Sequence, residues 1–202
     1  MNRRLLDRAI GIIACGPYYW VFYTDIRDGI PNLVSALLVA NLILWIGTMT
    51  TRRSPARVTR SWAYWGLAFL ATYWPFLVLV ITNDGHAIVP IWLCDAVSIA
   101  GALIACWARI SLGRNIGIVP AQRKLVTRGA YRFVRHPIYT GIFVLLIASA
   151  LRAYSVINAT TVAIGIALYM LKSLTEERFL AQDAAYRSYA TSVRRRWIPG
   201  LL

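Results

Sequence analysis

The chain has few charged residues and very few acidic ones. Charged side chains make up 15% of its 202 residues, and its 22 Lys and Arg face only 8 Asp and Glu. A soluble domain normally carries about 25% charged residues. With 58% hydrophobic residues and a mean hydropathy of +0.56, this composition argues against a soluble globular domain. It indicates a membrane protein, as do the long uncharged runs.

Cysteine and histidine are also scarce. The three cysteines, Cys15, Cys94 and Cys106, lie inside apolar runs and form no C-x-x-C pair. Neither a disulfide framework nor a zinc site is therefore predicted. The two histidines, His86 and His136, are expected on opposite sides of the membrane, so we expect no bound metal. A Rossmann glycine-rich fingerprint and a Ser-His-Asp set are also missing.

The apolar runs predict an all-α polytopic transmembrane bundle of about six membrane helices in a single domain, residues 1–202. The expected helices cover residues 9–24, 31–50, 62–82, 91–110, 137–151 and 154–171. The first is short for a span of about 20 residues. The last two flank Arg152 and predict a tight hairpin, which an amphipathic helix over residues 172–193 follows. Asp95, inside a span, is expected to make a structural polar contact.

The basic residues are distributed unevenly over the predicted loops. All but two of the 22, Arg27 and Arg152, fall on one side of the predicted bundle. The positive-inside rule then predicts that both termini and the loop over residues 111–136 lie in the cytoplasm. This distribution explains the net charge of +14 through membrane topology. We therefore expect membrane lipids as partners and no nucleic acid.

One stretch, residues 125–141, joins a basic loop to a new apolar run. It reads LVTRGAYRFVRHPIYTG. Pro137 suits the first position of a helix, because its missing N–H would be unpaired there anyway. The N-terminus of that helix would lie beside Arg135 and His136, where free N–H groups favour an anionic group. Gly129 and Gly141 allow tight turning or close backbone approach.

These motifs, in this order, resemble the isoprenylcysteine carboxyl methyltransferase family of integral membrane enzymes. The resemblance covers roughly the C-terminal half, whereas residues 1–107 match only in being apolar. It is carried by Leu125-Val126, Gly129, Tyr131, Arg135 to Gly141 and Glu176-Glu177, with Leu112 to Asn115, Tyr186, Tyr189 and Ile198-Pro199 also fitting. Ordered motifs separated by a hairpin are a stronger signal than any one motif alone.

The resemblance implies S-adenosylmethionine (SAM) as cofactor, bound at the cytoplasmic end of the hairpin. The residues expected to bind it are Lys124, Leu125, Val126, Tyr131, His136, Pro137, Ile138, Tyr139 and Glu176. The hairpin should fold Glu176 back towards His136, and Glu176 is favoured over Glu177 as the ligand. A basic residue at the place of Lys172, at the end of the last span, resembles the family's substrate contact. Arg109 and Arg135 are alternatives.

Methyl transfer from a sulfonium to an ionised carboxylate needs no general base, so positioning would supply the catalysis. The expected acceptor is a lipophilic carboxylate, such as that of a prenylcysteine, that enters from the bilayer. A phospholipid amine, or a small thiol or amine, is an alternative acceptor. A non-catalytic transporter or membrane scaffold is an alternative of another class. It would need polar residues along the spans and would leave the ordered motifs unexplained.

Overall fold

A computed structural model describes residues 33–81 and 85–198. The helix expected over residues 9–24 and Cys15 lie outside these residues. The described helices are α3 (Leu33–Thr50), α4 (Trp62–Ile81), α5 (Ile91–Leu112), α6 (Pro137–Arg152), α7 (Val156–Leu180) and α8 (Ala184–Ser192). Two 3-10 turns, Gly113–Asn115 and Gly129–Arg132, and a two-stranded pair of β1 (Arg57–Val58) and β2 (Ala121–Gln122) complete the described elements. The predicted all-α membrane bundle is confirmed.

Three of the described helices are long and apolar enough to cross a membrane. They are α3, the helical stretch Ile91–Asn115 and α7, whereas α6 is apolar but has only 16 residues. The predicted hairpin is confirmed, because α6 ends at Arg152 and α7 begins at Val156. Ser155 caps α7 by accepting a hydrogen bond from the backbone N–H of Asn158 at 3.1 Å.

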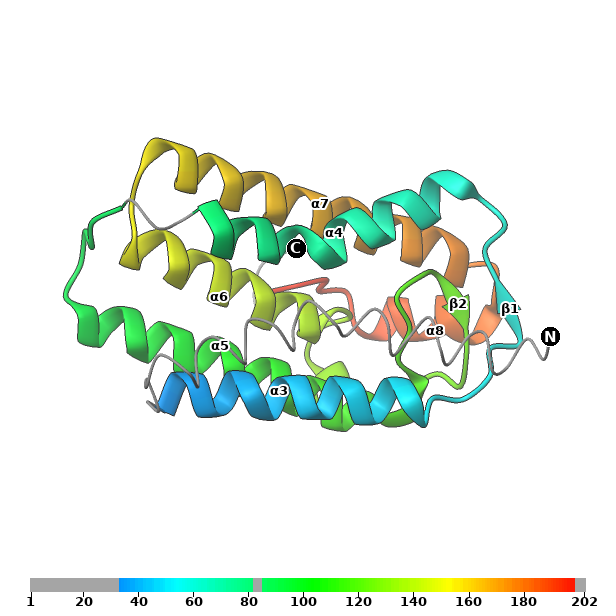
Figure 1. Ribbon diagram of the computed structural model, residues 1–202. Helices are drawn as coiled ribbons and strands as arrows, with labels where there is room; N and C mark the ends of the chain where they lie inside the picture. The colour runs from blue at the N-terminus through cyan, green and yellow to red at the C-terminus, as the bar shows by residue number, and fades with distance from the viewer. Residues whose placement is uncertain (1–32, 82–84, 199–202) are drawn as a thin grey trace.

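The helices run side by side along one direction (Figure 1). α4 lies against α7, α3 lies against α5, and α6 packs between them, with its most extensive contact on α5. The β1–β2 pair and α8 lie at one end of the bundle, and residues 85–90, which lead into α5, and the connection from α6 to α7 lie at the other (Figure 1). The polar motifs from both halves of the chain therefore meet at the first end.

Small residues bring α5 and α6 close together. A Cβ on Gly141 would lie 2.7 Å from the backbone N of Ala105 and 2.8 Å from the backbone O of Gly101. Glycine at this position lets two helix backbones approach closely, as is common between membrane helices. The tight seam fixes the start of α6, and with it His136, relative to α5.

One predicted helix boundary is wrong. The sequence interpretation ended the last span at residue 171 and began a separate helix at 172, but α7 continues without a break to Leu180. Lysine, leucine, glutamate and arginine in this stretch are all good helix formers, so the change from apolar to polar residues does not end the helix. The amphipathic helix is correspondingly shorter, Ala184–Ser192, and Asp183 caps it through the backbone N–H of Ala185 at 2.9 Å.

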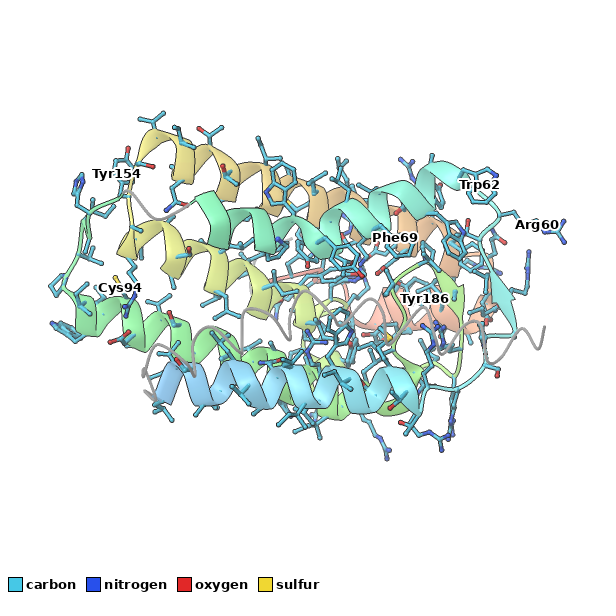
Figure 2. The ribbon with its side chains drawn as sticks, viewed as in Figure 1. Arg60, Trp62, Phe69, Cys94, Tyr154 and Tyr186 are labelled. Atoms are coloured by element: carbon cyan, nitrogen blue, oxygen red, sulfur yellow. The ribbon has the colours of Figure 1, made fainter. Side chains whose placement is uncertain are left out.

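The opposite end of the bundle carries the polar contact expected for Asp95. Its carboxylate is paired with the guanidinium of Arg152, which joins the first half of α5 to the end of α6. His86 forms a backbone bridge with Tyr154 at the same end. Cys94 and Tyr154 mark this end in Figure 2. These residues join the segment before α5 to the α6–α7 connection and lie away from the motifs at the other end.

Candidate active site

A cleft of about 210 Å³ opens at the end of the bundle that carries α8 and β2. Its walls come from α5, α6 and α7, from the segment between α5 and α6, and from α8. The N-terminal half contributes Trp45, Met49 and Thr72. Tyr186, on the inner side of α8, is labelled in Figure 2. The cleft is thus a meeting point of chain segments that are distant in sequence.

Glu176 is the only carboxylate among the described residues that line the cleft. The phenol of Tyr139 donates a hydrogen bond of 2.8 Å to its Oε1, and its Oε2 lies 3.9 Å from Nδ1 of His136. The ring of His136 stacks on the ring of Tyr139, with centroids 5.4 Å apart and planes only 2° from parallel. The predicted folding of Glu176 back towards His136 is therefore confirmed.

Glu177, the next residue, lies in a cluster of basic groups instead. Its carboxylate accepts a bidentate pair of hydrogen bonds from Arg135, at 2.8 and 3.2 Å, and a third from Nε of Arg196 at 3.1 Å. Nε2 of His136 lies 3.0 Å from the same carboxylate. Paired guanidinium–carboxylate bonds of this geometry are strong and directional. Glu177 therefore connects the loop before α6 to the C-terminal segment.

Further bonds complete this connection. Nη1 of Arg135 donates to the backbone carbonyls of Ala190, Val193 and Arg194 at 3.1–3.3 Å. The backbone N–H groups of Arg135 and His136 donate to the carbonyls of Arg195 and Arg196 at 2.9 and 2.8 Å. Arg135 borders the cleft, but these donors are occupied by Glu177 and by the C-terminal backbone.

Lys172 lies one helical turn before Glu176 and deep in the bundle. Its side chain is 4% exposed, and Nζ donates a hydrogen bond of 2.9 Å to Oγ1 of Thr72 in α4. Nζ also lies 5.5 and 5.8 Å from the ring centroids of Tyr139 and Tyr169, within range of a cation–π interaction. The helix does not end just before Lys172 as expected, because α7 continues beyond it for about two turns.

Arg109, at the end of α5, lies on the α3 side of the cleft. Its Nε donates a hydrogen bond of 2.8 Å to Oδ1 of Asn41, and the guanidinium lies 5.9 Å from the ring centroid of Trp45. Nδ2 of Asn41 in turn donates to the backbone carbonyl of Ala102 at 3.0 Å. Asn41, a buried residue in the middle of α3, therefore orients Arg109.

The segment between α5 and α6 supplies a buried acceptor at the cleft wall. Nδ2 of Asn115 donates to the backbone carbonyl of Leu112 at 3.2 Å. Its buried Oδ1, on a residue that lines the cleft, has no hydrogen-bond partner among the described residues. A buried polar atom without a partner costs free energy. Its position on the cleft wall indicates a place for a donor of a bound molecule.

Two tyrosines close the α8 side of the cleft. The phenol of Tyr189 donates a hydrogen bond of 2.7 Å to the backbone carbonyl of Tyr131. Burial raises the pKa of Tyr189 to about 12, and burial also raises the pKa of Tyr131 above its usual range. Both phenols therefore stay neutral at physiological pH, and the Tyr189 proton is used in the bond to the backbone of Tyr131.

The structure places almost all of the predicted site residues around one cleft. Of the twelve named from the sequence, all except Pro137 line it. Pro137 instead occupies the first position of α6, as predicted. Sequence reasoning missed Asn41, Thr72 and Tyr169. Asn41 and Thr72 are polar residues inside apolar runs, and that exception to the pattern was the signal that could have found them.

Residues 89–187 match the family model of phospholipid methyltransferase. The matched region begins just before α5 and ends within α8, so it contains most of the cleft. A comparison with curated proteins finds no match. The family match indicates a methyltransferase, and such enzymes use SAM as methyl donor. With the three apolar helices, it also indicates an integral membrane protein.

The residues of the cleft fit SAM in charge and in hydrogen-bonding capacity. SAM carries a sulfonium, an ammonium, a ribose diol and a carboxylate. Glu176 offers a carboxylate to the positive groups or the diol, and Oδ1 of Asn115 offers an acceptor to which no described residue donates. Lys124, whose side chain is exposed at the rim, offers a cation to the carboxylate.

Proposed function

We propose that the protein is a SAM-dependent membrane methyltransferase whose acceptor is a lipophilic carboxylate, such as that of a prenylcysteine. One observation supports this most directly: Glu176 and Lys172, on successive turns of α7, line the same cleft. The two opposite charges divide the cleft into a part suited to a cationic cofactor and a part suited to an anionic acceptor.

In this proposal the cofactor occupies the outer part of the cleft. Glu176, oriented by Tyr139, binds a positive group or the ribose, while Asn115 and Lys124, from the segment between α5 and α6, bind other groups of the cofactor. His136 lines this part of the cleft, together with Leu125, Val126, Tyr131 and Ile138. Pro137, at the first position of α6, does not line the cleft but fixes the positions of its neighbours His136 and Ile138. When bound, SAM supplies an electrophilic methyl group that an ionised carboxylate can attack without a general base.

The acceptor occupies the deeper part. Its carboxylate would contact Lys172 and Arg109, while Trp45, Met49 and Ile142 face its apolar portion. Lys172 is held by Thr72, and Arg109 is held by Asn41, so both cations are oriented before the acceptor arrives. The protein's contribution to the reaction is then positioning and exclusion of water. Arg135 is left out of this contact because its donors bind Glu177 and the C-terminal backbone.

A phospholipid amine is the second candidate acceptor, and the family match favours it. The faces of Tyr139 and Tyr169 near Lys172 also offer a cation–π surface, which suits an ammonium.

We place both termini and the cleft on the cytoplasmic side, because the basic residues gather at that end. In either case the acceptor would enter sideways from the bilayer.

The first experiment measures cofactor binding to the purified protein in detergent by calorimetry. We expect binding of SAM or of its demethylated product. Folded protein that binds neither would contradict the enzyme assignment.

The second experiment identifies the acceptor and uses Lys172→Met. Methyl transfer from labelled SAM is followed to N-acetyl-farnesylcysteine and, in parallel, to phosphatidylethanolamine liposomes. For a carboxylate acceptor the substitution should raise the acceptor KM strongly and leave SAM affinity nearly unchanged, since it leaves a desolvated anion unpaired. Transfer to the lipid amine alone would contradict the carboxylate assignment and support the second candidate.

A further inference from the structure

A second groove, of about 800 Å³, lies outside the cleft. It is formed by β1 and the residues around it, by the first turn of α4 and by the last turn of α7. Three arginines line it, Arg57, Arg60 and Arg178, and no Asp or Glu does so among the described residues. All three side chains are exposed. Figure 2 shows Arg60 pointing outward from this end of the bundle.

Among the described residues, no carboxylate pairs with these three guanidinium groups. Elsewhere at this end arginines are paired, as Arg135 and Arg196 are with Glu177. In the described part of the chain, no hydrogen bond or ion pair is formed by the side chains of Arg57, Arg60 or Arg178. Three like charges around one groove repel each other, and an anion placed between them would relieve this repulsion.

The groove lies at the level where the membrane should end. α4 begins at Trp62, whose side chain is 85% exposed, and Tyr64 lines the groove two residues later. Exposed tryptophan and tyrosine at helix ends are typical of the headgroup level of a bilayer. Val58 and the half-buried Phe179 add apolar surface beside the arginines. The groove therefore combines a cationic part with an apolar part.

We propose that this groove binds the phosphate headgroup of an anionic phospholipid from the bilayer. Guanidinium groups match phosphate oxygens with paired hydrogen bonds, and the apolar side chains would contact the glycerol and the start of the acyl chains. The site is separate from the cleft and does not depend on the methyl-transfer proposal. Its occupant is a bound lipid that need not be methylated.

The test uses the full chain in detergent at 0.15 M salt, with short-chain phosphatidylglycerol as probe and calorimetry as readout. The groove variant carries Arg57→Gln, Arg60→Gln and Arg178→Gln. The matched control carries Arg53→Gln, Arg128→Gln and Arg132→Gln, which removes the same charge from exposed arginines outside both the groove and the cleft. We expect the groove variant to raise the Kd at least tenfold and the control to change it less than twofold.

Three results would overturn the proposal. An equal loss in both variants would show general attraction to positive charge, and an unchanged Kd in the groove variant would show that the lipid binds elsewhere. Inorganic phosphate that binds as tightly as the lipid would show a site for a free anion. Should the triple variant fail to fold, Arg60→Gln alone, at an exposed side chain that forms no hydrogen bond or ion pair with the described residues, is expected to weaken lipid binding measurably. No effect would again contradict the site.

Discussion

The two adjacent glutamates of α7 should respond in opposite ways to loss of charge. Glu177 accepts four hydrogen bonds from Arg135, His136 and Arg196, at 2.8–3.2 Å. Glu176 accepts one, from Tyr139, and faces the cleft. Glu177→Gln should therefore reduce stability, whereas Glu176→Gln should reduce affinity for SAM.

The magnitudes follow from burial. The side chains of Arg135 and Glu177 are 8% and 13% exposed, and breaking a buried ion pair costs about 3–5 kcal/mol. Arg196 is 39% exposed, so solvent screens its ion pair with Glu177 and that pair contributes little to the free energy of unfolding. We expect Glu177→Gln to cost about 3 kcal/mol, the lower end of that range. In Glu176→Gln the amide oxygen can still accept from Tyr139, so the cost should stay below about 1 kcal/mol.

The loss of a charge-assisted hydrogen bond to the cofactor is worth about 1.5–3 kcal/mol. This corresponds to roughly a 10- to 100-fold weaker Kd for SAM in Glu176→Gln. Stability is measured by SDS unfolding in mixed micelles with circular dichroism, and affinity by calorimetry. Normal SAM binding by Glu176→Gln would refute its assignment as cofactor ligand. Normal stability of Glu177→Gln would refute the structural role of the Arg135–Glu177–Arg196 cluster.

Three further predictions test other parts of the structure. Gly141→Val should destabilise the bundle by about 1–3 kcal/mol or more, because a Cβ would meet the α5 backbone. SDS unfolding measures this loss, with Gly47→Ala as the control, since a Cβ on Gly47 would meet open space. Asn41→Leu should raise the acceptor KM without changing SAM affinity, because Arg109 loses its orientation; an unchanged KM would contradict this. The backbone N–H of Ala185 and the amide of Gln122 lower the pKa of Asp183, so its stabilisation of α8 is present at neutral pH and lost as the pH falls below about 4. Asp183→Asn should abolish that acid-dependent part of the melting curve, and an identical curve would count against the cap.

Several features of this protein could be predicted from its sequence. Run lengths and the position of Pro137 predicted the helices and the start of α6, because apolar runs in a membrane have few alternatives to helix. Motif order predicted the residues around the cleft, although the binding roles stay predictions. The helix boundary predicted at residue 172 was wrong, since a polar residue ends an apolar run without ending a helix. Lys172 therefore lies within α7, buried in the bundle, and not at a helix end.

Tertiary structure alone decided which residues of the N-terminal half take part and how the two glutamates differ. Asn41 and Thr72 contact Arg109 and Lys172 across 68 and 100 residues of sequence, and no local pattern reports such pairing. Glu176 and Glu177 are chemically identical neighbours. Successive residues of an α-helix project about 100° apart, so one carboxylate faces the cleft and the other faces Arg135 and Arg196. Only the packing of α6 and of the C-terminal segment against α7 determines which of the two carboxylates faces the cleft.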